Sequence, residues 1–195
     1  MSTPGQRKAG IASNTGGDLY ETPPEAIKAL LDREKFLGPI WEPAAGRGAI
    51  AQAFRNAGWL TVETDIVSHP LREHPLIWER DFLFSGEAPR HPSGYECRSL
   101  VTNPPFSLLT KFMHHAAMPT LYLDKWALLI PLNALSGRAR RAKIYDIHPP
   151  TRVLVFSERI KFRRDGYEGK VSPLGVHAWA IWHRDIPKTT TMEWI

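Results

Sequence analysis

The chain has 195 residues, of which 43% are hydrophobic and 23% charged, a composition that suits one folded domain and excludes wholesale disorder. No stretch approaches eighteen consecutive apolar residues, and the first eighteen residues lack the apolar core of a secretory signal, so neither a membrane span nor secretion is expected. The single cysteine, Cys97, excludes an internal disulfide and a cysteine-based zinc site, which favours a cytoplasmic setting. The histidines lack metal-ligand spacing, so no metal ion is expected.

The net charge of +5 is concentrated in one part of the chain. Residues 136–170 contain ten basic and four acidic side chains, a net charge of +6, whereas the other 160 residues contain 15 basic and 16 acidic ones. A concentrated basic segment indicates a polyanionic partner, with nucleic acid as the first candidate. On charge alone, a solvated basic face that only aids solubility is an equally good interpretation.

The predicted elements begin after a flexible arm. Residues 1–18 are rich in Gly, Ser, Thr and Lys and have no apolar period, which is typical of a mobile terminus, and residues 19–195 are expected to form a single domain. Thr22-Pro23-Pro24-Glu25 combines a capping box with proline at the first helical position. The pattern predicts a helix there, which Gly38-Pro39 ends.

From residue 40 onward, short apolar strands alternate with helices. Strands are expected at 40–42, 59–64, 76–80, 99–102, 126–130, 152–156 and 176–182. Helices are expected between 48 and 58, from 107, and over 137–145. This alternation predicts an α/β fold with a parallel sheet covered on both faces by helices.

Four polar residues stand where predicted strands end: Glu42, Asp65, Asp81 and Asn103. Ligands of such sheets bind beyond the carboxyl ends of the strands. We therefore expect a site where these four side chains converge.

The turn from Glu42 to Gly48 is built of small residues, which let the backbone pass close to a ligand at a helix N-terminus. The run Gly46-x-Gly48-x-x-Ala51 also satisfies a loose dinucleotide fingerprint, which makes a NAD-binding protein one alternative. Asp65, which follows Gly48 by 17 residues, would bind ribose hydroxyls in either case. A tight turn without a ligand is the other interpretation.

The tetrapeptide Asn103-Pro104-Pro105-Phe106 is the more specific signal, because a given four-residue string occurs by chance in roughly one chain per thousand of this length. The Asn103 side-chain oxygen and the Pro104 carbonyl can accept the two N–H bonds of a planar amine and direct its lone pair at an electrophilic methyl group. Adjacent prolines preorganise both acceptors, and Phe106 can stack on a base. A stiff turn that closes a strand leaves the asparagine unexplained.

Taken together, these motifs resemble those of the DNA adenine-N6 methyltransferases, which use S-adenosylmethionine. The likeness runs from about Tyr20 to Trp182 and includes Tyr20-Glu21-Thr22-Pro23 before the first strand. It implies a class I, Rossmann-like three-layer fold with a mostly parallel seven-stranded sheet whose last strand is antiparallel. The catalytic residues it implies are Asn103, Pro104, Pro105 and Phe106. The cofactor-binding residues it implies are Tyr20, Thr22, Pro23, Glu42, Ala44, Gly46, Gly48, Asp65, Asp81 and Phe82.

One departure from the family concerns DNA recognition. Larger relatives carry a separate target-recognition domain, whereas only 13 residues follow Trp182 here. Contacts with DNA are therefore expected from loops 132–150 and 158–173, with short or relaxed sequence specificity and an affinity dominated by phosphates. The stretch 159–162 is similar to that of small phage-type members, in which Phe162 would be a second stacking residue. The nucleic-acid contacts expected are Arg138, Arg140, Arg141, Lys143, Phe162, Arg163 and Arg164.

Other functions stay open on the same residues. An RNA base or a protein glutamine also presents a planar amine, so the chemistry would be unchanged on either acceptor. A non-catalytic nucleic-acid-binding module on the same fold is a second alternative. The NAD-binding alternative leaves Asn103 to Phe106 unexplained.

Overall fold

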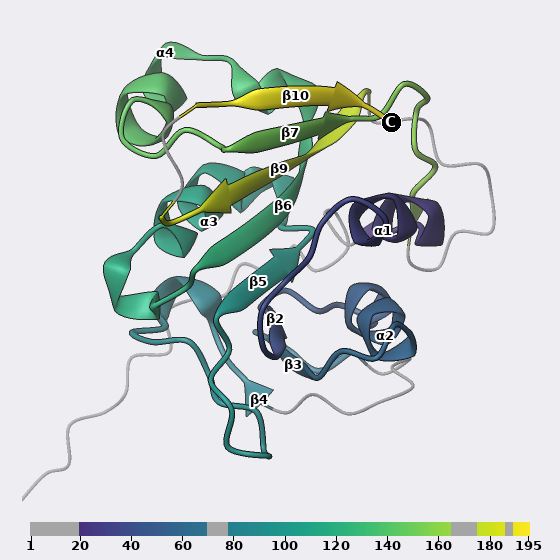
Figure 1. Ribbon diagram of the computed structural model, residues 1–195, viewed down its shortest axis with the longest axis vertical. Coiled ribbons are helices and arrows are strands. Elements are labelled where there is room, and N and C mark those ends of the chain that lie inside the picture. Colours follow the sequence, from purple (N-terminus) through teal and green to yellow (C-terminus); the bar gives the residue numbers. More distant parts are fainter. Residues whose placement is uncertain (1–19, 70–77, 165–174, 186–188) are drawn as a thin grey trace, which may run out of the picture.

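The computed structural model describes residues 20–69, 78–164, 175–185 and 189–195 (Figure 1). The predicted arm, residues 1–18, lies outside the described residues. No helix in the described part of the chain is long and apolar enough to span a membrane.

The centre of the fold is an eight-stranded sheet with the order β10-β7-β9-β6-β5-β2-β3-β4. Strand β9 runs antiparallel to both of its neighbours, and every other pairing in this sheet is parallel. The strands are β2 (Ile40–Glu42), β3 (Thr61–Asp65), β4 (Trp78–Glu79), β5 (Ser99–Thr102), β6 (Lys125–Pro131), β7 (Arg152–Val155), β9 (His177–His183) and β10 (Thr191–Trp194).

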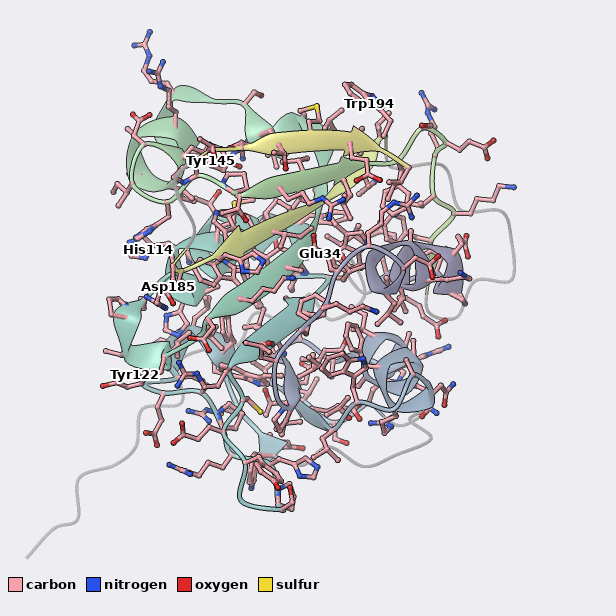
Figure 2. The ribbon with its side chains drawn as sticks, viewed as in Figure 1. Glu34, His114, Tyr122, Tyr145, Asp185 and Trp194 are labelled. Atoms are coloured by element: carbon pink, nitrogen blue, oxygen red, sulfur yellow. The ribbon has the colours of Figure 1, made fainter. Side chains whose placement is uncertain are left out.

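The predicted α/β class is confirmed, with one addition to the expected seven strands. The chain continues past β9 and adds β10 at the edge of the sheet, parallel to β7. The strand expected last, at 176–182, is β9, and it is antiparallel as expected. The additional strand β10 follows it in the chain and is parallel to β7. Trp194 of β10 is labelled at this edge in Figure 2 and is largely exposed.

Helices cover both faces of the sheet. The α-helices are α1 (Pro24–Leu31), α2 (Ala49–Asn56), α3 (Leu109–Ala116) and α4 (Arg138–Arg140). The shorter helical segments are η1 (Phe82–Phe84), η2 (Phe106–Leu108), η3 (Pro119–Leu121), η4 (Leu132–Leu135) and the π-helix η5 (Arg141–Tyr145).

Two hydrophobic cores lie on opposite faces of the sheet, as β6 shows. Leu128 and Ile130 belong to a core that includes the apolar side chains of α3. Ala127 and Leu129 belong to a second core, with side chains of α1 and α2. Because side chains alternate along a strand, a strand covered on both faces is apolar along most of its length, as β6 is from Trp126 to Pro131. The predicted three-layer arrangement follows from this packing.

Local details differ from the prediction at two helices. Pro24 occupies the first turn of α1 as expected, but the N-cap residue is Pro23 and no side chain caps the helix. The capping box expected from Thr22 is therefore absent, since the capping position is held by a residue with no side-chain acceptor. The predicted helix over 137–145 is one turn of α4 followed by the π-helix η5.

A separate two-stranded antiparallel ribbon joins β1 (Tyr20–Glu21) to β8 (Arg163–Arg164). Tyr20 pairs with Arg164, and Glu21 pairs with Arg163. The ribbon brings the start of the described chain beside a segment about 140 residues away.

An ion-pair network ties β10 to the sheet. Glu34, labelled in Figure 2, is buried and pairs with Lys125 at the start of β6 and with Arg152 at the start of β7. Arg152 and Arg33 both pair with Glu193 of β10. A buried carboxylate with two cationic partners is stable where an isolated one would not be.

Candidate active site

Glu42, Asp65, Asp81 and Asn103 follow or end strands β2, β3, β4 and β5. These strands are neighbours in the sheet and all run parallel. The fold therefore brings the four residues to one edge of the sheet, which we call the carboxyl edge.

The turn after β2 is held by its own backbone and by Glu42. Gly46 and Gly48 have φ angles of 49° and 89°, in the left-handed region that side chains other than glycine adopt at a cost. The buried Glu42 carboxylate accepts a hydrogen bond from the backbone N–H of Ala51 at 2.9 Å. Glu42 thus fixes the first turn of α2 from inside the fold, while Gly46 and the half-buried Ala44 stay partly accessible.

Asp65 links this turn to the end of β3. Its two carboxylate oxygens accept hydrogen bonds from the backbone N–H groups of Gly46, at 2.8 Å, and Ile66, at 2.7 Å. Both bonds come from backbone N–H groups, so they fix the carboxylate relative to the turn after β2 and the end of β3. Asp65 is therefore oriented by the backbone at the carboxyl edge.

Asp81 and Phe82 differ in their access to a ligand. Asp81 is exposed and accepts a hydrogen bond from the N–H of Leu83 at 2.9 Å. Phe82 is 1% exposed, with its ring centre 5.3 Å from that of Trp41. The Phe82 ring belongs to the core, so a cofactor contact by this residue, which stays a prediction, would use its backbone.

Two exposed apolar side chains at the same edge were not predicted as site residues. Ile66 directly follows Asp65 and is half exposed, and Phe84 in η1 is 88% exposed. The sequence signal that could have identified them is an apolar residue shortly after an acidic residue at the end of a strand, as Ile66 is after Asp65 and Phe84 is after Asp81. The sequence does not show which of Phe82 and Phe84 faces outward.

The two polar atoms of the Asn103 side-chain amide differ in their hydrogen bonding. Its Nδ2 donates a hydrogen bond to the Tyr20 carbonyl oxygen at 3.1 Å. Its Oδ1 is buried and has no hydrogen-bond partner in the described part of the chain. The carbonyl of Tyr20 needs a donor, so it fixes the amide with Oδ1 as the open acceptor. A buried polar atom without a partner is uncommon and points to a missing donor.

An aromatic cluster surrounds the tetrapeptide. The rings of Tyr20 and Phe106 are stacked, with centres 6.0 Å apart and an interplanar angle of 19°. Phe162 meets both rings edge-on, at 6.0 Å from Tyr20 and 6.3 Å from Phe106. Phe162 is 3% exposed, so here it supports Phe106 from within the fold and is not presented to a base.

His177 completes this cluster and was missed by sequence reasoning. It is the first residue of β9, is 0% exposed, and lies 4.8 Å from Phe162 and 5.6 Å from Phe106 between ring centres. Burial lowers the pKa of His177 below its ordinary value, so the ring is neutral at pH 7. Its Nδ1 lies 3.2 Å from the Gly175 carbonyl and must be the donor, while Nε2 has no partner among the described residues. A lone histidine at a strand start carries no signal for this position.

The basic residues predicted on α4 and η5 divide into two kinds. Arg138 and Lys143 are exposed. Arg140 donates to the Ser136 carbonyl at 3.1 Å, and Arg141 pairs with Asp146 at 3.2 Å. Figure 1 shows α4 beside the starts of β7 and β10, away from their arrowheads. These residues therefore stand apart from the carboxyl edge.

The other predicted contacts lie close to the site. Arg163 and Arg164 form β8, which places their backbone beside Tyr20 and Glu21. Thr22 and Pro23 follow β1 directly and are buried. Within the described residues, no group of three or more His, Cys, Asp or Glu side chains is arranged to hold a metal ion.

Solved structures similar to this chain are related to it at low sequence identity. One is a candidate RNA methyltransferase from Pyrococcus horikoshii, 12% identical over 83% of this chain and 82% of that chain, with a TM-score of 0.56. Another is a modification subunit of a candidate type I restriction enzyme from Vibrio vulnificus, 14% identical over 94% of this chain, with a TM-score of 0.56; the match spans 48% of that subunit. A candidate hemolysin from Lactococcus lactis is 12% identical over 86% of this chain and 89% of its own, also with a TM-score of 0.56.

These likenesses establish the fold alone. The chain has the class I, Rossmann-like fold of methyltransferases, as the sequence predicted, with an eighth strand added. No protein-family model matches the chain, and no curated protein matches its sequence.

Proposed function

We propose that this protein transfers a methyl group from S-adenosylmethionine to the N6 amine of adenine in DNA. The observation that carries the proposal is Asn103, whose Nδ2 donates to the Tyr20 carbonyl and whose buried Oδ1 at the carboxyl edge has no hydrogen-bond partner among the described residues. A buried acceptor without a donor costs about 1–3 kcal/mol. An incoming N–H group would remove that cost, and a planar amine offers two.

The residues at the carboxyl edge fit the cofactor. The glycines of the turn after β2 let the backbone approach a ligand closely, at the N-terminus of α2. Asp65, which lies at the carboxyl edge beside this turn, would bind the ribose hydroxyls, and the exposed Ile66 and Phe84 offer apolar surface to the adenine ring. When bound, the cofactor supplies a methyl group on a positively charged sulfur.

The chain's own task is to present the amine. Asn103 Oδ1 and the Pro104 carbonyl would each accept one N–H bond, which directs the nitrogen lone pair at the methyl group. After transfer the nitrogen is cationic and loses a proton to water, so no strong base is needed. The target base is first flipped out of the duplex at a cost of a few kcal/mol.

A methyl-transfer panel tests the proposal. The protein is incubated with radiolabelled S-adenosylmethionine and, separately, plasmid DNA, ribosomal RNA and a glutamine-containing peptide, with Asn103→Ala as the matched control. We expect label in DNA, recovered as N6-methyladenine after digestion. Label found only in RNA or only in the peptide would support methyl transfer and would show that DNA is not the substrate. Cofactor binding without transfer to any acceptor would favour a non-catalytic module.

A further inference from the structure

The segment after β7, residues 157–162, runs along the carboxyl edge; we call it the strap. It begins where the N–H of Ser157 donates to the Ile195 carbonyl at 2.7 Å, and it leads into β8, which pairs with β1. Figure 1 shows it in light green beyond the arrowhead of β7, on the same side as α1. The strap is therefore connected at its far end to the residue that orients Asn103.

Side chains of the strap alternate between the core and solvent. Ile160 and Phe162 are buried in the core that includes α1 and α2, and Phe162 contacts Phe106. Arg159 and Lys161 are exposed. Since alternate residues of an extended segment point to opposite sides, the two buried anchors fix the backbone of both cations while the charged groups stay outside. Two positive charges are thus held at the rim of the aromatic cluster.

The strap cations differ from two of the four basic residues on α4 and η5, which we call the first basic cluster (Arg138, Arg140, Arg141 and Lys143). Neither Arg159 nor Lys161 has an ion pair or side-chain hydrogen bond with any residue that the structure describes, whereas Arg140 and Arg141 have intramolecular partners. A cation with a partner must give it up to bind a phosphate and gains less by doing so. The one acidic residue in the strap is Glu158.

From this arrangement we propose that Arg159 and Lys161 bind the phosphates of DNA that flank the target base, so that the strap rather than α4 is the principal backbone contact. The inference rests on the proposed DNA substrate. Phosphate contacts position a nucleic acid without reading its sequence, and two of them beside Phe106 would set the flipped base over Asn103. Because Phe162 is buried in the core, the backbone that carries Arg159 and Lys161 is held in a fixed position.

Salt-dependent binding tests the inference. Arg159→Ala, Lys161→Ala and the double variant are compared with the original protein by fluorescence anisotropy on a 20-base-pair duplex, at several KCl concentrations. Each lost phosphate contact reduces the slope of log K against log salt by about 0.9, which corresponds to an affinity loss of about eightfold at 0.1 M salt. The double variant should lose about 1.8 in slope.

Lys35→Ala is the matched control. Lys35 is exposed, and its carbonyl accepts a hydrogen bond from the side chain of Lys125 at the start of β6. Lys35 therefore lies at the amino end of β6, opposite the carboxyl edge where the strap runs. Its substitution removes one positive charge and should leave the slope unchanged. All the substituted side chains are exposed, and thermal unfolding verifies that each variant keeps its fold.

Four outcomes overturn the inference. The first two are an unchanged slope in the double variant and an equal decrease in slope in Lys35→Ala. The other two are a larger decrease in slope from Arg138→Ala and Lys143→Ala on the first basic cluster, and a slope that depends on the strap with duplex RNA but not with DNA. Methyl transfer is measured separately on the same proteins. Strap-dependent DNA binding without any transfer upholds this inference and overturns the proposed function. Methyl transfer to DNA together with an unchanged slope in the double variant upholds the proposed function and overturns this inference.

Discussion

Replacing Asn103 with alanine should separate activity from stability. The substitution removes the hydrogen bond to the Tyr20 carbonyl, a net contribution of about 0.5–1.5 kcal/mol, and it also removes an unpaired buried oxygen whose burial costs about 1–3 kcal/mol. These terms have opposite signs and similar size. We therefore expect the free energy of unfolding to change by less than about 1 kcal/mol, a shift in Tm of no more than about 4 °C for a chain of this length.

The same substitution should nearly abolish catalysis. Loss of an oriented hydrogen-bonding group in a preorganised site costs about 2.7–4 kcal/mol of transition-state stabilisation, a rate decrease of about 100- to 1,000-fold. Initial rates of methyl transfer measure this, and calorimetry should give nearly unchanged cofactor affinity because the proposed partner of Asn103 is the amine and not the cofactor. Urea unfolding followed by fluorescence of the seven tryptophans supplies the stability.

Asn103→Asp sharpens the test. It keeps an acceptor but replaces the donor to the Tyr20 carbonyl by a carboxylate oxygen, which repels that carbonyl. Asn103→Asp should therefore be less stable than Asn103→Ala at pH 7. The reverse order, a loss of more than about 3 kcal/mol in Asn103→Ala, or retained transfer by Asn103→Ala would each refute the orientation argued for this amide.

Three further predictions address the cofactor edge, the core and the sheet edge. Asp65→Ala removes the acceptor for two backbone N–H groups, so cofactor affinity measured by calorimetry should fall at least about tenfold, whereas unchanged affinity would contradict the ribose-binding role. Burial raises the pKa of Cys97 to about 12, so a disulfide reagent at pH 8 should modify it only as fast as the protein unfolds; rapid labelling of the native state would show that the thiol is accessible. Hydrogen bonds from Arg152 and Arg33 lower the pKa of Glu193, so its contribution is present above its unfolded value of about 4.3 and is lost as pH falls through the lowered folded value. Urea unfolding should show Glu193→Gln less stable than the original protein at pH 7 and closer to it at pH 3, and an equal gap at both pH values would contradict the ion pairing.

Much of the fold was predictable because strands buried on both faces have a strong local pattern. The bounds of β2 and β5 match their predicted ranges, and the α/β alternation led to the correct class. Strand β10 was not predicted, because Thr191–Trp194 is only four residues long and mostly exposed at a sheet edge, and a polar–apolar alternation over four residues is too short to indicate a strand. The ribbon of β1 and β8 is only two residues long on each side, so its existence depends on tertiary contacts that no local pattern encodes.

The sequence predicted where the candidate site lies in the fold, but it did not predict in which direction the aromatic side chains point. Strand-ending polar residues meet at one edge in any parallel sheet, so Asp65 and Asn103 could be placed from the sequence. Whether an aromatic residue faces solvent or core depends on backbone turns, and for that reason the sequence did not indicate that the rings of Phe82 and Phe162, expected to contact cofactor and base, are both buried. His177 enters the cluster through the antiparallel pairing of β9, which brings a late part of the chain back to the carboxyl edge.

The hydrogen bond between Asn103 and residue 20 uses a main-chain carbonyl, and this protects it from side-chain replacement. Any residue at position 20 offers the same oxygen, so Tyr20→Ala removes a ring from Phe106 and keeps the acceptor for Asn103. Shortening the chain past residue 20 removes both. The two alterations together separate the contribution of the aromatic surface from that of the backbone. They also make the placement of an N-terminal tag or fusion a variable to control whenever activity is compared between preparations.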